Sequence, residues 1–133
     1  MQPQIYGIGN PLIDILISAT DTDLKKLELA KGVMHLVDEV RQSEIIQYFN
    51  NSNHKYMPGG SAPNTILACA GLGISSLISG KIGDDKFGNI YEEQAKQYGA
   101  INGLVKGSGV TGSSIILVTP DGERTMNTHL GMC

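Results

Sequence analysis

The segment Pro58–Asn64 combines two adjacent glycines with the start of a predicted helix. Gly59 and Gly60 can adopt backbone conformations closed to other residues, and they leave the main chain open to a ligand. Ser61 is a favourable N-cap residue, and a helix that begins here presents free N–H donors and the positive end of its dipole. Asn64, one turn into the helix, can donate and accept hydrogen bonds, which suits a sugar hydroxyl. An isolated Gly-Gly-Ser sequence favours a simple strand-to-helix turn, so the interpretation as a binding site depends on the rest of the chain.

One carboxylate, Asp14, interrupts the apolar run between Leu12 and Ile17. A strand over this run places Asp14 at a buried or half-buried position, where a charge is costly unless it gains partners. Two interpretations of this segment remain equally open. Asp14 is either an outward-facing charge on a half-exposed strand or a carboxylate that accepts hydrogen bonds from the hydroxyl groups of a polyol.

Two glycine-rich stretches invite a nucleotide-binding interpretation and fail it. Gly7-Ile8-Gly9-Asn10 follows a predicted strand, but Pro11 stands where a helix should begin and Leu12 replaces the third glycine of the dinucleotide fingerprint. Gly80-Lys81 resembles the end of a phosphate-binding loop, yet Ile82 replaces the required Ser or Thr. Asp84 and Asp85 are better explained as capping and dipole partners in the first turn of a helix than as a metal pair.

The composition limits the class of protein. A length of 133 residues with 41% hydrophobic and 17% charged residues predicts one folded domain with a core. A net charge of −3 with scattered basic residues argues against a nucleic-acid surface. No apolar run reaches membrane-spanning length, and the N-terminus lacks the features of a signal peptide. Two cysteines without metal-ligand spacing complete the expectation of a reduced, cytoplasmic protein.

Strand-like and helix-like segments alternate along much of the chain, which predicts a parallel, layered α/β sheet with some antiparallel structure beside it. The helix that follows the Gly-Gly turn is apolar nearly all round, so we expect it to be buried. The turn at 120–123 predicts a hairpin. The expected strands are 5–9, 12–19, 34–37, 55–57, 75–82, 104–105, 113–119 and 124–129, and the expected helices are 21–29, 38–49, 62–72 and 83–99.

Four motifs in this order resemble the ribokinase family of sugar and nucleoside kinases, also called PfkB-like carbohydrate kinases. They lie at 7–14, 59–64, 80–88 and 111–125 and together extend over essentially the whole chain. Each motif is modest alone, whereas the four in sequence are highly specific. The opening Gly-Asn-Pro-Leu-Ile-Asp is more similar to the adenosine kinase-like branch than to ribokinase itself.

The resemblance implies a Rossmann-like ribokinase fold with a small β-sheet lid, built from segments near 12–19, 34–37, 55–58 and 113–129. It implies an ATP- and Mg²⁺-dependent phosphotransferase that acts on the hydroxymethyl group of an adenosine-like nucleoside or a sugar. Asp14 would hydrogen-bond the sugar hydroxyls, and Gly59-Gly60 would form the hinge on which the lid closes. A homodimer formed through the lid is a partner that the resemblance allows, whereas no nucleic acid or membrane is expected. The substrate-binding residues that it implies are Asn10, Asp14, Gly59, Gly60 and Asn64.

The chain also departs from the family. Members are about twice as long, within the range of single α/β domains, and their second half carries an Asp-Thr-x-Gly-Ala-Gly-Asp motif that ends in the general base. That motif does not occur in this sequence. We therefore expect residues 1–133 to be a truncated, N-terminal substrate-binding portion with no catalytic residue and no activity alone. An open sheet edge should make it poorly stable or prone to association.

The alternative is a non-catalytic module that binds a nucleoside or sugar, or that oligomerises. Both hypotheses use the same residues. A reading frame that continues past Cys133 with the missing motif would separate them.

Overall fold

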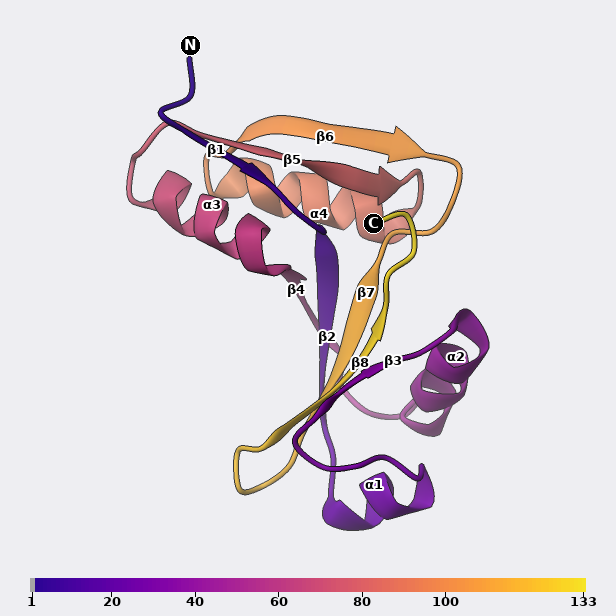
Figure 1. Ribbon diagram of the computed structural model, residues 1–133. Coiled ribbons are helices and arrows are strands. Elements are labelled where there is room, and N and C mark those ends of the chain that lie inside the picture. The colour runs from indigo at the N-terminus through magenta and orange to yellow at the C-terminus, as the bar shows by residue number, and fades with distance from the viewer. Residues whose placement is uncertain (1) are drawn as a thin grey trace. The chain divides into compact units, whose positions relative to one another are not determined.

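The computed structural model describes residues 2–133 and divides the chain into two compact units. Unit 1 comprises the chain up to Ile13 together with Met57–Gly112 and Leu130–Cys133. Unit 2 comprises Asp14–Tyr56 and Ser113–His129. Figure 1 shows the elements of both units, and each unit is described by itself.

Unit 1 contains a parallel three-stranded sheet in the order β1-β5-β6. Parallel neighbours cannot be joined by a tight turn, so the chain crosses over through a helix between strands. Helix α3 lies between β1 and β5 in this unit, and α4 joins β5 to β6; both helices lie on the same side of the sheet in Figure 1. The bounds are β1 Ile5–Ile8, α3 Ser61–Gly71, β5 Ser76–Gly83, α4 Lys86–Gln97 and β6 Ile101–Gly107.

The core of unit 1 lies between this sheet and its helices. Ile66 of α3 packs where Gly7 leaves room for it on β1, and Ile78 and Ile82 of β5 have no exposed surface. Tyr91 of α4 is also fully buried. The expectation that α3 is buried is confirmed for one face only, because Asn64 and other polar or small residues leave the other face of the helix exposed.

Unit 2 contains most of a five-stranded mixed sheet in the order β3-β8-β7-β2-β4, although the first residues of β2, up to Ile13, and the last residues of β4, from Met57, are assigned to unit 1. The predicted hairpin is confirmed, since β7 and β8 pair antiparallel, whereas β3 pairs parallel with β8. The bounds are β2 Leu12–Ser18, α1 Asp21–Lys26, β3 Met34–Leu36, α2 Glu39–Tyr48, β4 Lys55–Gly59, β7 Ser113–Val118 and β8 Arg124–His129.

Period-two alternation fixes which face of β2 is buried. Ile13 is fully buried and Ile15 is 1% exposed, while Asp14 between them is half-buried, because successive side chains of a strand point to opposite faces. Helix α2 is attached to the sheet by its buried Gln42, whose Nε2 donates to the Ser113 carbonyl oxygen at 3.1 Å. The Ser113 hydroxyl in turn donates to Gln42 Oε1 at 3.0 Å.

The helix starts differ in how they are capped. Asp38, the first residue of the expected helix 38–49, is the N-cap of α2 and accepts the Arg41 N–H at 2.8 Å. Helix α1 begins at Asp21, but its N-cap is the preceding Thr20, which forms a reciprocal capping box with Asp23. Asp85 caps α4 and accepts the Gly88 N–H at 2.8 Å, whereas Asp84 precedes the cap and is not part of the first turn. Over residues 2–133, no helix is both long and apolar enough to cross a membrane.

Candidate functional site

The turn that precedes α3 requires glycine for two reasons. Gly60 is the N-cap of α3 and has φ +98°, a backbone conformation that side chains rarely tolerate. A Cβ atom added to Gly60 would also collide with the carbonyl oxygen of Asn10 and would lie 3.0 Å from Cγ of Pro63. The sequence predicts that this turn excludes side chains for conformational rather than packing reasons. The positive φ of Gly60 confirms the conformational reason, but the exclusion of packing is wrong, because the Asn10 backbone also leaves no room for a side chain.

The predicted capping role of Ser61 is wrong. The Gly60 carbonyl oxygen accepts the Asn64 N–H at 2.9 Å, so Gly60 holds the cap position and Ser61 is the first helical residue. No side chain of the described residues 2–133 caps this end of α3. The N–H groups of the first turn are therefore not satisfied by a capping side chain and could bind an outside acceptor.

Four of the five predicted substrate-binding residues belong to unit 1 and surround this turn. The backbone of Asn10 packs against Gly60, Gly59 directly precedes it, and Asn64 lies one turn into α3. The side chains of Asn10 and Asn64 are exposed. Unit 1 thus combines exposed amide side chains with a helix start that has no side-chain cap.

A hydrogen bond from a buried tyrosine supports this turn. The Tyr91 hydroxyl donates to the Gly59 carbonyl oxygen at 2.9 Å, and both residues are buried. The helical spacing of apolar residues within the expected helix 83–99 predicts only apolar packing for Tyr91. The phenol of Tyr91 could have indicated a polar contact, because a buried tyrosine hydroxyl normally has a hydrogen-bond partner.

The fifth predicted residue, Asp14, lies on β2 in unit 2 and is not among the groups that unit 1 brings together. Burial raises the pKa of Asp14, and the positive charge of Arg124 on β8 opposes this rise. A half-buried carboxylate of this kind gains stability when ligand hydroxyl groups donate hydrogen bonds to it.

Asp85 accepts hydrogen bonds from the segment that precedes β7. Its carboxylate accepts the Thr111 hydroxyl at 2.6 Å and the Thr111 N–H at 2.9 Å, in addition to the capping bond from Gly88. Burial would raise the pKa of Asp85, but the hydrogen bonds from Thr111 and Gly88 lower it below its ordinary value. The sequence predicts the cap, whereas the partner 26 residues further along the chain is visible only in the structure.

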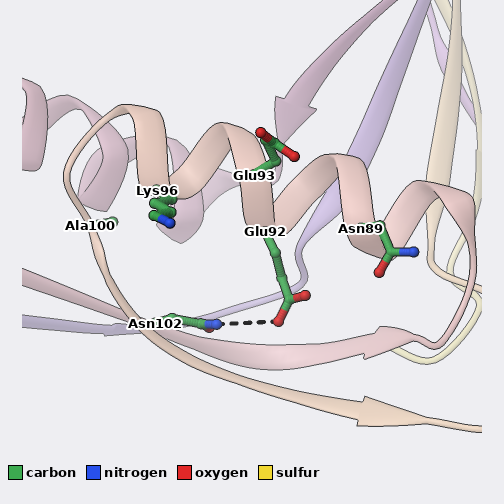
Figure 2. Close-up of a pocket in the computed structure, with 6 residues that line it drawn as sticks. All are labelled: Asn89, Glu92, Glu93, Lys96, Ala100 and Asn102. Carbon is green, nitrogen blue, oxygen red and sulfur yellow. Dashed lines mark hydrogen bonds between the residues drawn. The ribbon is translucent and has the colours of Figure 1, made fainter.

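A polar hollow lies on another part of unit 1, over α4 and β6 (Figure 2). Glu92 in this hollow pairs with Lys106 at 2.8 Å and accepts a hydrogen bond from Asn102 at 3.2 Å. The contact with Lys106, followed by that with Asn102, lowers the pKa of Glu92. None of the predicted substrate-binding residues lines the hollow, so we assign it no ligand. Its lining consists of Asn89, Glu92, Glu93, Lys96, Ala100 and Asn102.

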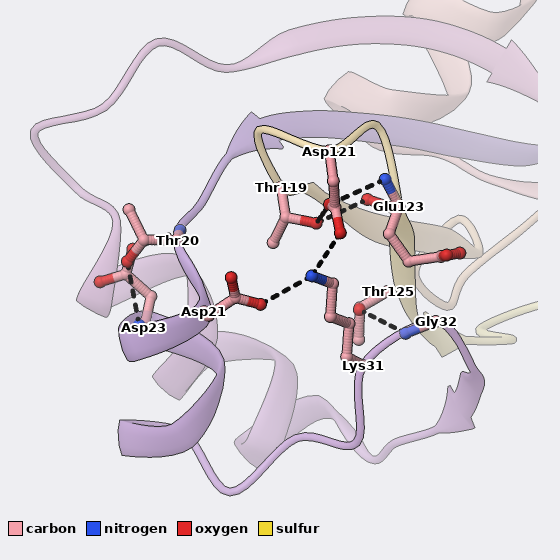
Figure 3. A network of polar contacts seen from close by, with 9 residues as sticks. All are labelled: Thr20, Asp21, Asp23, Lys31, Gly32, Thr119, Asp121, Glu123 and Thr125. Carbon is pink, nitrogen blue, oxygen red and sulfur yellow. Dashed lines mark hydrogen bonds and ion pairs between the residues drawn. The ribbon is translucent and has the colours of Figure 1, made fainter.

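A second polar cluster joins α1 to the β7–β8 turn in unit 2 (Figure 3). The ammonium of Lys31 lies 2.7 Å from a carboxylate oxygen of Asp21 and 2.7 Å from one of Asp121. These hydrogen bonds, first that to Asp121 and then that to Asp21, raise the pKa of Lys31 to about 12. The two carboxylates are largely solvent-accessible and Lys31 is partly so, and we therefore interpret the cluster as a surface contact rather than a site.

Comparison with known proteins supplies an independent observation. The family described as pfkB family carbohydrate kinase matches residues 33–132. Adenosine kinase 2 of Arabidopsis thaliana is 27% identical over 131 residues. Among solved structures, adenosine kinase from Sinorhizobium meliloti is 32% identical with a TM-score of 0.84. A probable sugar kinase from Rhizobium etli CFN 42 is 31% identical with a TM-score of 0.85.

These matches include nearly all of this chain but only part of each relative. The comparison covers 95% of this chain and 37% of the Arabidopsis protein. It covers all of this chain and 41% of the Sinorhizobium structure, and 97% of this chain and 39% of the Rhizobium structure. The predicted ribokinase-type α/β fold is confirmed, and the chain spans about 40% of the length of these relatives.

Proposed function

Because the chain belongs to the pfkB family of carbohydrate kinases, we propose that it supplies the substrate-binding part of an ATP-dependent phosphotransferase. The proposed substrate is a nucleoside, with adenosine first and a sugar next, phosphorylated on its hydroxymethyl group. The similarity to adenosine kinases over almost the whole chain favours a nucleoside. A sugar follows because a sugar kinase is equally similar in fold.

The turn before α3 is the observation that carries this proposal. Gly60 brings bare backbone next to an uncapped helix start, and the amide side chains of Asn10 and Asn64 are exposed beside it. Backbone N–H groups can donate to the hydroxyl groups of a ribose, and side-chain amides can both donate and accept, in each case without a net charge. We propose that Asn10, Gly59, Gly60 and Asn64 bind this part of the substrate.

Asp14 is proposed to bind the sugar hydroxyls from the sheet of unit 2. A hydrogen bond to a charged acceptor contributes about 1.5–3 kcal/mol net. The segments of unit 2 would then act as a lid that closes over the substrate and excludes water. A homodimer formed through this lid remains part of the proposal.

ATP and Mg²⁺ are proposed on family grounds alone. Within residues 2–133, no group of three His, Cys, Asp or Glu side chains could hold a metal ion. Gly80 and Lys81 lie inside strand β5 rather than in a phosphate-binding loop. The role proposed for the described residues is therefore substrate recognition, and residues 1–133 alone are expected to transfer no phosphate.

Titration calorimetry of the chain with adenosine and with ribose tests the proposal. Asp14→Asn should weaken the affinity by roughly ten- to a hundredfold, the equivalent of one lost charged hydrogen bond. Asp84→Asn is the matched control, because Asp84 is an exposed aspartate of unit 1 outside the proposed site. Asn64→Ala should also weaken binding, whereas Asn89→Ala should not.

Two results would contradict the proposal. Wild-type chain that binds neither nucleoside nor sugar would remove the substrate-binding role, and unchanged affinity in Asp14→Asn would remove Asp14 from the site. The alternative, a binding module that never takes part in phosphate transfer, predicts the same titrations. An assay of ATP turnover with adenosine distinguishes the two hypotheses, when it is carried out on the protein as it occurs in its own cells.

A further inference from the structure

Strand β6 contains an asparagine that is followed directly by a glycine, Asn102-Gly103. No other asparagine of the sequence precedes a glycine. The side-chain carbonyl carbon of an asparagine can be attacked by the backbone nitrogen of the next residue, and glycine has no Cβ atom to hinder that approach. Asn102 is therefore the asparagine whose neighbour least opposes this reaction, and the structure shows how its side chain is placed.

The side chain of Asn102 lies along its own strand. Its Oδ1 accepts the N–H of Leu104, two residues further along the chain, at 2.9 Å. This hydrogen bond closes an Asx turn, a ring that includes the Gly103 nitrogen, so Cγ of Asn102 is held close to that nitrogen. The Leu104 N–H also points at the oxygen on which negative charge develops during the attack, as a donor of an oxyanion hole does. The turn therefore favours the attack both by position and by charge.

Strand β6 is an edge of its sheet. Among residues 2–133, β6 pairs with β5 alone, because it stands at the end of the order β1-β5-β6. The Leu104 N–H bonds a side chain of its own strand rather than a further strand, and Asn102 is exposed. Water therefore reaches this site, and an edge strand opens locally at lower cost than a strand paired on both sides.

We propose that Asn102 is a site of spontaneous deamidation, a covalent modification that needs only water. The Gly103 nitrogen gives up its proton to solvent base and bonds to Cγ of Asn102. The Cγ–Nδ2 bond breaks, and the amide group leaves as ammonia after taking a proton from water. Water then adds to one of the two carbonyl carbons of the cyclic imide and breaks the bond of that carbon to nitrogen. The product is aspartate or, when the chain continues through the side-chain carbon, isoaspartate.

Deamidation would replace a hydrogen-bond donor with a negative charge beside α4. Nδ2 of Asn102 donates to a carboxylate oxygen of Glu92 at 3.2 Å. The product carboxylate cannot donate this bond and repels the charge of Glu92, while the ammonium of Lys106, 2.8 Å from Glu92, offsets part of the repulsion. Isoaspartate also lengthens the main chain of β6 by a carbon atom, which displaces the following residues from their register with β5. The modification should therefore weaken the contact of β6 with α4.

The other asparagines of the chain are less favourable sites, because each is followed by a residue with a Cβ atom. Asn51 and Asn53 are exposed in the loop before β4, but serine and histidine follow them. Asn127 has no exposed surface, and threonine follows it. The proposal depends on neither the family nor the substrate, so a failure to bind adenosine would leave it standing.

Peptide mapping of the chain tests the proposal. The chain is incubated in mildly alkaline buffer without denaturant and digested. Chromatography and mass spectrometry then separate the asparagine, aspartate and isoaspartate forms of each peptide. We expect aspartate and isoaspartate at position 102 to form at least about tenfold faster than at Asn51, the exposed internal control. An equal or faster reaction at Asn51, or the absence of isoaspartate at position 102, would overturn the proposal.

The same measurement in urea separates the Asx turn from the Asn-Gly sequence. Unfolding removes the hydrogen bond from Leu104 but leaves Gly103 as the next residue. The rate at Asn102 relative to the rate at Asn51 should therefore be at least about threefold lower in urea than in the folded chain. An unchanged or higher ratio in urea would remove the Asx turn from the explanation.

Two variants test the consequence for the contact between β6 and α4. Asn102→Asp carries the charge of the product in a chain of normal length, and it should speed amide hydrogen exchange in α4 by roughly threefold. Asn51→Asp adds the same charge in the exposed loop before β4 and is the matched control, which should leave that exchange unchanged. Equal exchange in the two variants would overturn the expected weakening of this contact.

Discussion

Each unit contains a glycine with positive φ at a turn and an aspartate that contacts a residue distant in the sequence. The surroundings of these residues differ between the two units. In unit 1, Gly60 abuts the Asn10 carbonyl oxygen, and Asp85 is hydrogen-bonded to Thr111, which is 2% exposed. In unit 2, a Cβ atom on Gly122 would meet no atom of the described chain within 4 Å. The ion pair of Lys31 and Asp121 in unit 2 lies at the surface.

This contrast separates residue type from environment. A glycine with positive φ has a conformational cost of replacement in either unit, but only in unit 1 does close packing add to it. An aspartate holds hydrogen bonds in either unit, but water competes for those at the surface and salt screens them. The same residue types should therefore matter more for stability in unit 1.

The largest expected effect comes from alanine at the two glycines. Gly122→Ala should lower the free energy of unfolding by about 1–2 kcal/mol, the cost of a side chain at positive φ. Gly60→Ala should cost a further ~1–3 kcal/mol, since the added Cβ must displace the Asn10 backbone. Hydrogen exchange followed by NMR would measure the loss within each unit. Equal losses at the two glycines would remove the packing argument for Gly60.

The next effect concerns the Asp85–Thr111 network. Asp85→Ala removes the acceptor for three hydrogen bonds and should lower the stability of unit 1 by about 2 kcal/mol. Thr111→Val combined with Asp85→Ala should show a coupling energy of at least about 1 kcal/mol in a double-mutant cycle. Asp84→Ala is the control and should stay within about 0.5 kcal/mol of wild type. Strict additivity of the two substitutions would show that the network is not a unit.

A smaller effect is a difference in pH dependence between the units. The pKa of Asp85 is lowered, so its contribution to stability is present above 3.8, the ordinary value, and is lost as the pH falls through the folded-state pKa. The pKa of Asp14 is raised, so the folded state keeps a proton that the unfolded state has lost. Stability from Asp14 therefore falls as the pH rises from 3.8 through its folded-state pKa.

Asp14→Asn tests the second sign. At pH 7 the variant should melt at a higher temperature than wild type, because it lacks the half-buried charge, and the gain should vanish below the ordinary pKa of 3.8. Asp85→Asn should show the opposite pattern, with a loss at pH 7 that disappears in acid. A loss of stability at pH 7 in Asp14→Asn would show that the contact with Arg124 outweighs burial.

The smallest effect is expected for the surface pair. Lys31→Met should leave the thermal midpoint unchanged in 1 M salt and lower it slightly at low ionic strength, since exposed ion pairs are weak and screened. Lys25→Met, at another exposed lysine, serves as the control. A large, salt-independent decrease of the thermal midpoint in Lys31→Met would contradict the expectation that these contacts matter less for stability in unit 2 than in unit 1.

Local patterns predicted most of the secondary structure. The alternation in β2, the Asp38 and Asp85 caps and the turn between β7 and β8 depend on neighbouring residues, so they are legible in the sequence. The position of the α3 cap was missed by one residue, because a serine is the better cap by type. The tight contact of Gly60 with Asn10 selects the glycine instead.

The sequence by itself determined the family, the α/β fold and the residues proposed to bind substrate, because these reside in short motifs whose order along the chain is specific. Only the tertiary structure decided which groups act together. Tyr91 supports Gly59 across 32 positions, Thr111 is held by Asp85 across 26, and Asn102 of β6 donates to Glu92 of α4 across 10. Contacts between distant segments depend on how strands pair and helices pack, and local sequence patterns do not specify those choices.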